Sequence, residues 1–110
     1  MPTTALLVLC NTPDADCAAQ IAQTLVERRL AACVNILAPC QSVYRWQGKI
    51  EHAAEVPLLI KTTRARYAEL QATLAEAHPY ELPEIIAVPL HEGLPAYLAW
   101  VGAETTEQHP

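Results

Sequence analysis

The pattern of apolar positions divides the first third of the chain into a strand followed by a helix. Ala5–Cys10 is a short, continuously apolar run, which is typical of a buried strand. The Thr12-Pro13-Asp14 segment that follows predicts a helix start, because proline suits the first helical turn and Thr12 or Asp14 can cap it. Apolar residues then recur at helical spacing, at Cys17, Ala18, Ile21, Ala22 and Leu25. We therefore expect a helix that ends near Arg29.

The middle of the chain has the pattern of a long hairpin. Cys33–Gln47 is rich in β-forming residues, and Pro39 within it indicates a bulge or an edge kink. Two-residue alternation places three side chains of its second half on one face, namely Ser42, Tyr44 and Trp46. A tight turn at Gln47-Gly48 leads into the partner strand Lys49–Lys61, whose buried end is Val56–Ile60.

The next segment predicts a second helix and a fourth strand. Thr62 or Thr63 can cap the helix, which ends at Pro79. Its apolar side consists of Tyr67, Leu70, Leu74 and Ala77. Ile85–Leu90 then reads as a strand.

The order of these elements predicts an α+β fold. Pro95 opens a last short helix that bears Leu94, Tyr97, Leu98 and Val101, and Glu104–Pro110 is a polar tail. The sequence is therefore β-α-β-β-α-β plus a terminal helix, the split βαβ arrangement. Both crossovers place their helices on one face of an antiparallel sheet, so we expect other subunits to cover the second face.

Composition narrows the class of protein. The 110 residues and 12.0 kDa predict one domain spanning residues 1–110. The hydrophobic fraction of 52% exceeds the usual value of about 45–50%, which favours a subunit interface. The net charge of −5 argues against nucleic-acid binding. No apolar run is long enough for a membrane span, and the N-terminus lacks the basic region of a signal peptide. We therefore expect a cytoplasmic protein.

The four cysteines do not form a recognisable metal or redox motif. They occupy positions 10, 17, 33 and 40, so C-x-x-C is absent, and disulfides are disfavoured in the cytosol. Cys17 and Cys33 fit buried core positions. Cys10 ends a strand beside a turn, where a thiol can reach solvent and a ligand. We expect Cys10 or Cys40 to react first with a thiol reagent, and Cys17 and Cys33 to react slowly.

The segment from Ala77 to Pro89 carries the densest group of chemically active side chains. Pro79 and Pro83 stiffen a short connector. The connector holds an imidazole, a phenol and two carboxylates near a strand end, on His78, Tyr80, Glu81 and Glu84. Such a group is either a functional site or a helix stop in which Tyr80 fills a gap in the core.

Several blocks of the sequence together resemble the CutA divalent-cation-tolerance proteins. The blocks are V-L-C-N-T-P-D at 8–14, L-A-A-C-V-N-I at 30–36, S-V-Y-R-W-Q-G-K-I at 42–50, E-V-P-L-L-I-K-T at 55–62, H-P-Y-E-L-P-E-I at 78–85 and Y-L-A-W at 97–100. The resemblance covers about Leu7 to Val101. It implies a ferredoxin-like fold assembled as a homotrimer around long hairpins. It also implies inter-subunit clefts like those of PII signalling proteins, and binding of copper or another divalent cation, with no organic cofactor.

The resemblance assigns metal ligands to two residues. The family's proposed copper ligands are a cysteine at the end of the first strand and two adjacent histidines before P-Y. Cys10 and His78 match two of these, and Ala77 replaces the first histidine. Glu84 or a group from a neighbouring chain is then needed to complete a site. The remaining histidines have the character of surface or loop residues, namely His52, His91 and His109.

The matching blocks also supply candidates for a ligand cleft between subunits. These are Tyr44, Trp46, Glu55, Lys61, Tyr80, Glu84 and Trp100. Tyrosine and tryptophan would line such a cleft with an apolar body and a polar tip. The alternative is that these residues only pack a subunit interface.

Three classes of function follow from the sequence. The first is a trimeric copper-binding protein of ion homeostasis, and the second is a PII-like sensor or scaffold whose cleft binds an anionic metabolite or a partner's segment. The third is a hydrolase that uses His78 with Glu84 as a base, or Cys10 as a nucleophile. The third is the weakest, because the sequence has no nucleophile–base spacing and no glycine-rich phosphate loop. We therefore expect a binding protein, not an enzyme.

Overall fold

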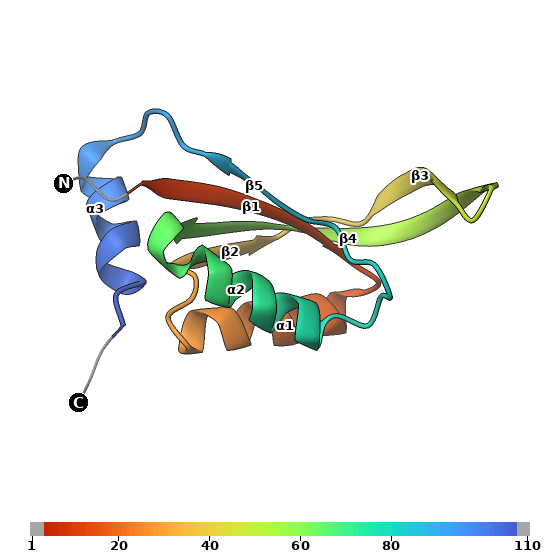
Figure 1. Cartoon of the computed structure of the whole chain (residues 1–110), viewed down its shortest axis with the longest axis horizontal. Helices are drawn as coiled ribbons and strands as arrows, with labels where there is room; N and C mark the ends of the chain where they lie inside the picture. The colour runs from red at the N-terminus through yellow and green to blue at the C-terminus, as the bar shows by residue number, and fades with distance from the viewer. Residues whose placement is uncertain (1–3, 108–110) are drawn as a thin grey trace.

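The chain folds as the predicted α+β sequence of elements, with the second strand divided in two. The computed structural model describes residues 4–107 (Figure 1). Its elements are β1 (Ala5–Thr12), α1 (Ala15–Glu27), β2 (Cys33–Ile36), β3 (Cys40–Trp46), β4 (Lys49–Thr63), α2 (Arg64–Ala77), β5 (Ile85–Pro89) and α3 (Pro95–Glu104). The break between β2 and β3 contains Pro39, which has no amide hydrogen to donate to the sheet.

The antiparallel sheet is built around β4. The strand order is β2-β4-β1-β5, and β3 pairs with the other half of β4. The β3–β4 hairpin extends beyond the helices as an arm (Figure 1). Its turn residues, Gln47 and Gly48, have φ angles of 50° and 80°. Two successive positive φ values are typical of a type I′ turn, whose twist suits a two-residue hairpin loop. The predicted tight turn is therefore confirmed.

One face of the sheet is covered by α1 and α2, as the sequence predicts (Figure 1). Side chains from this face and from the two helices form the core, in which the largest fully buried apolar residues include Val8, Leu25, Leu58, Ile60, Leu70 and Leu74. Asp14 caps α1, because its Oδ1 accepts a hydrogen bond from the amide of Cys17 at 2.8 Å. Thr63 occupies the N-cap position of α2 but makes no side-chain capping bond.

The opposite face of the sheet is apolar as well. Leu9 pairs with Leu59 and with Ile86, and residues paired in this way lie on the same face. On the same face Leu7 pairs with Val88. Ile86 is 52% exposed and Val88 is 47% exposed. We call this surface the open face, because α1 and α2 lie on the other side and α3 lies at the end of the sheet (Figure 1).

Among residues 4–107, no helix has both the length and the apolar character needed to cross a membrane.

Candidate functional site

His78 is a buried residue whose ring is fully engaged in hydrogen bonds. It follows the last turn of α2, and only 6% of it is exposed. The Tyr80 amide donates to Nδ1 at 3.2 Å, which fixes Nδ1 as the unprotonated nitrogen. The protonated Nε2 therefore donates to the carbonyl oxygen of Asn11 at 2.7 Å. The ring also packs against Tyr80 with a centroid distance of 4.7 Å.

Cys10 is also buried, and the prediction that its thiol reaches solvent is wrong. Strand β1 continues to Thr12, so Cys10 lies inside the sheet and faces the core. Its Sγ is 3.8 Å from the carbonyl oxygen of Asn11. Burial is the main cause that raises the pKa of the thiol to about 12, and the nearby Glu84, Cys17 and Glu55 add to it. The thiol is therefore protonated at neutral pH.

Cys10 and His78 both approach the carbonyl oxygen of Asn11, but their arrangement does not fit a copper site. A soft metal needs a thiolate and a free imidazole lone pair, and here the thiol keeps its proton and both ring nitrogens have partners. Within the described part of the chain, no group of three or more histidine, cysteine, aspartate or glutamate residues could hold a metal ion. His52 and His91 are exposed, as expected, and His109 lies outside the described residues.

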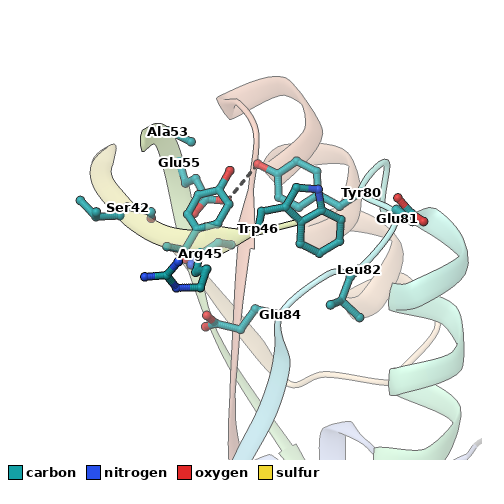
Figure 2. Close-up of a pocket in the computed structure, with 12 residues that line it drawn as sticks. Ser42, Arg45, Trp46, Ala53, Glu55, Tyr80, Glu81, Leu82 and Glu84 are labelled. Carbon is teal, nitrogen blue, oxygen red and sulfur yellow. Dashed lines mark hydrogen bonds between the residues drawn. The ribbon is translucent and has the colours of Figure 1, made fainter. Parts of the chain in front are cut away.

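A cavity of about 810 Å³ lies at the base of the hairpin arm (Figure 2). Strand β1, the hairpin and the connector after α2 all contribute to its lining. The lining residues are Asn11, Ser42, Val43, Tyr44, Arg45, Trp46, Ala53, Glu55, Tyr80, Glu81, Leu82 and Glu84. Strands β1 and β3 are far apart in the sequence, but they meet here because both pair with β4.

Glu55 is the buried acidic group of this cavity. It is 8% exposed, and its Oε2 accepts a hydrogen bond from the Tyr80 hydroxyl at 2.9 Å (Figure 2). Burial, followed by this contact with Glu55, raises the pKa of Tyr80 above its ordinary value, so the hydroxyl stays protonated. No other side-chain partner of Glu55 occurs within residues 4–107. The second oxygen, Oε1, has no hydrogen-bond partner there, whereas every fully buried polar side-chain atom has one. Oε1 is therefore not fully buried, and because Glu55 lines the cavity, the cavity is where we expect Oε1 to be accessible.

Five of the seven predicted cleft residues lie together in this cavity: Tyr44, Trp46, Glu55, Tyr80 and Glu84. Sequence reasoning missed Asn11, Arg45 and Leu82, although each lies inside one of the matching blocks. Asn11 and Arg45 reach the cavity because β4 pairs with both β1 and β3, and Leu82 reaches it on the connector after α2; no local pattern reveals this meeting.

The other two predicted cleft residues lie elsewhere. Lys61 is near the far end of β4, where its Nζ donates to Asn35 Oδ1 and lies 3.7 Å from Cys33 Sγ. Trp100 is on α3 and packs against Tyr97 with a centroid distance of 5.5 Å. Cys33 itself is only partly buried, so its predicted place in the core is wrong. It pairs with Lys61 at the sheet edge and shares the open face with it.

Comparison with known proteins gives a consistent result over nearly the whole chain. The family model described as CutA1 divalent ion tolerance protein matches residues 6–104. The divalent-cation tolerance protein CutA of Pectobacterium atrosepticum is 41% identical over 90% of this chain and 90% of its own length. The protein of the same name from Thermus thermophilus is 44% identical over 90% of this chain and 96% of its own length.

The fold agrees with the sequence comparison. The crystal structure of CutA1 from Oryza sativa superposes with a TM-score of 0.93 at 34% identity, covering 97% of this chain and 98% of that one. The match extends over the sheet, all three helices and the hairpin that frames the cavity. The chain therefore belongs to the CutA1 family of divalent-cation tolerance proteins.

Proposed function

We propose that this protein is a homotrimer with a ferredoxin-like subunit, which acts by binding a ligand and not by catalysis. Its recognition site is the cavity at the base of the hairpin arm, which the trimer turns into a cleft between subunits. One observation carries the proposal: the exposed apolar face runs directly into the cavity. By alternation along β1, Leu7, Leu9 and the cavity residue Asn11 lie on one side.

The exposed apolar residues of the open face support the proposal that this face binds other subunits. Ile86 and Val88 are about half exposed and lie beside Leu7 and Leu9, so they form a contiguous apolar surface instead of scattered positions. The hairpin arm exposes further apolar residues, with Val43 at 63% and Ile50 at 62%. The number of three subunits follows from the resemblance to CutA proteins. A subunit docked on the open face would border the cavity along Asn11 and Glu84.

Light scattering of the purified protein tests this assembly. The expected mass is about three times the 12.0 kDa of one chain. Ile86→Lys places a charge on the open face and should give a folded monomer. Val26→Lys is the matched control, because Val26 is 44% exposed but lies on α1. A monomeric wild-type protein, or equal dissociation by both variants, would contradict the proposal.

We further propose that this binding takes place in the cytoplasm and contributes to tolerance of divalent cations. Membership of a family described by its tolerance of divalent cations supports the link to these ions. All four cysteines are unpaired, which supports a reducing compartment. A relative of known structure from Archaeoglobus fulgidus is described as periplasmic, so localisation of the tagged protein by fractionation is the direct test.

Copper binding at Cys10 and His78 is a second candidate function. The observation in its favour is that Sγ of Cys10 and Nε2 of His78 both approach the carbonyl oxygen of Asn11. It requires a conformation other than the one described, in which the thiol loses its proton and one ring nitrogen is released. Anaerobic calorimetry with Cu(I) tests it on wild type, Cys10→Ser and Ala77→His. Stronger binding by Ala77→His together with loss in Cys10→Ser would establish the pair, and equal binding by all three would exclude it.

A further inference from the structure

We infer that the cavity recognises a small organic cation, an ammonium group carried on an apolar body, through the buried carboxylate of Glu55 and the surrounding aromatic rings. The inference rests on the proposed function in one respect, namely that this cavity is the recognition site. It goes further by assigning the charge and the chemical class of the ligand.

The charge of the lining favours a cation over the anionic metabolite that the alternative, PII-like interpretation of the sequence includes. Three carboxylates line the cavity, on Glu55, Glu81 and Glu84, against one guanidinium, on Arg45. Lys61, the cation that sequence reasoning assigned to the cleft, lies near the other end of β4. Arg45 is exposed and forms no ion pair with these carboxylates within residues 4–107. An anionic ligand would therefore bring like charge beside the buried carboxylate of Glu55.

Glu55 has the bonding capacity that a bound cation requires. The Tyr80 hydroxyl fixes Oε2 in place, whereas Oε1 keeps access to the cavity. An ammonium group beside Oε1 would form a charge-assisted hydrogen bond in a partly desolvated place, where such bonds are strong. The fold thus prepares one oriented acceptor on Glu55, which forms no ion pair with a basic side chain within residues 4–107.

Aromatic side chains form the second part of the binding surface. Tyr44, Trp46 and Tyr80 line the same cavity as Glu55. Figure 2 shows that Trp46 projects from the hairpin toward the connector that carries Tyr80 and Leu82. The faces of such rings attract cations, and their bodies, with Leu82, provide apolar surface for the rest of a ligand.

The arrangement suits a molecule better than a bare metal ion. Among residues 4–107, the acidic residues do not converge with other ligating groups into a set of three that could hold a metal. They are distributed around a cavity of about 810 Å³, which has room for an extended organic body. A ligand of that size can present its charge to Glu55 while its apolar part contacts the rings.

Three probes that share one skeleton and differ in charge test the inference. Calorimetry measures the affinity of the intact protein for 2-phenylethylammonium, the neutral 2-phenylethanol and the anionic phenylacetate. We expect the ammonium to bind at least about tenfold more tightly than the alcohol, and phenylacetate to bind most weakly. Binding should also change the fluorescence of Trp46, because Trp46 lines the cavity. A Trp100→Phe background makes this signal assignable, since Trp46 is then the one remaining tryptophan.

Charge-neutral substitutions assign the effect to Glu55. Glu55→Gln should reduce the preference for ammonium over alcohol by at least about fivefold while binding of the alcohol stays the same. Glu76→Gln changes the net charge equally, and Glu76 is exposed on α2 outside the cavity, so this control should keep the preference. Equal loss in both variants would overturn the assignment.

The outcomes separate this inference from the proposed function. A trimer that binds phenylacetate most tightly, or binds all three probes equally, keeps the cavity as a binding site and overturns the cation assignment. A trimer that binds none of the probes overturns the cation assignment as well. A monomer in light scattering contradicts the proposed assembly, whatever the probes show.

Discussion

Two groups of polar side chains lie on either side of Asn11, and the fold uses their bonding capacity very differently. Cys10 and His78 approach the Asn11 backbone carbonyl, and both nitrogens of the imidazole are occupied by internal hydrogen bonds. Glu55 lies in the cavity that Asn11 also lines, and one of its oxygens stays available to a ligand. The first group holds the connector against β1, and the second is free to bind.

The difference shows that residue type alone does not identify a binding site. A cysteine and a histidine are the better metal ligands in chemical terms, yet burial keeps the thiol protonated and hydrogen bonds occupy the ring. A glutamate near aromatic rings is a less distinctive pattern than a cysteine with a histidine. The environment of Glu55 nevertheless leaves its carboxylate without an ion pair within residues 4–107, so a ligand can neutralise its charge. The following predictions test this contrast, beginning with the largest expected effect.

His78→Ala should lower the free energy of unfolding by about 2–4 kcal/mol, because a buried ring with two hydrogen bonds is lost. Urea unfolding monitored by circular dichroism measures the change. His52→Ala is the control, since His52 is exposed, and it should change stability by less than about 0.5 kcal/mol. Similar small effects for both substitutions would show that His78 does not hold the connector.

Tyr80→Phe should lower the free energy of unfolding by about 1–2 kcal/mol, because Oε2 of Glu55 loses its donor. A double-mutant cycle with Glu55→Gln isolates this contact. We expect a coupling energy between the two side chains of about 0.5–2 kcal/mol. A coupling energy near zero would mean that Tyr80 does not orient Glu55.

Stability should fall as pH rises above 9. The folded-state pKa of Cys10 is about 12 against a usual value of 9.0, and the pKa of Tyr80 is raised above 10.0. Because the unfolded chain loses these protons first, their contribution is fully present below pH 9 and is lost as pH approaches the folded-state values. Urea midpoints between pH 8 and 10.5 measure the slope, which Cys10→Ala should reduce. An unchanged slope in Cys10→Ala would contradict the burial of a protonated thiol.

Thiol labelling leaves the sequence unchanged and compares the reaction rates of individual cysteines in the folded protein. Cys10 should react with iodoacetamide at least about tenfold more slowly than Cys40, because burial excludes the reagent and keeps the thiol protonated. Pulse labelling followed by peptide mass spectrometry gives the rate for each cysteine. Equal rates for these two residues would mean that the end of β1 opens readily, and the copper candidate would gain support.

The fold could be predicted because its signals are local and mutually consistent. Each signal specifies one element independently of the others. The apolar run of β1 specifies a strand, the apolar spacing in α1 specifies a helix, and Gln47-Gly48 specifies a tight turn. Five cavity residues could be assigned because they lie in motif blocks that the family resemblance covers.

The error at Cys10, and the position of Lys61 outside the cavity, both arise from tertiary structure. The polar Asn11 and Thr12 suggested that the strand had ended, but the Thr12 hydroxyl donates to the Val56 carbonyl at 2.9 Å and the strand continues. Lys61 lies on the same strand as Glu55 and six residues further on. At about 3.3 Å per residue the two are therefore about 20 Å apart along the strand.

A growth assay tests most directly whether the cavity, and not the Cys10–His78 pair, carries the function. A bacterium that lacks its own CutA protein is grown in raised copper while it expresses wild type, Glu55→Gln, Glu76→Gln or Cys10→Ser at matched levels. We predict that wild type, Glu76→Gln and Cys10→Ser restore growth and that Glu55→Gln does not. Restored growth with Glu55→Gln and failure with Cys10→Ser would contradict the assignment of function to the cavity.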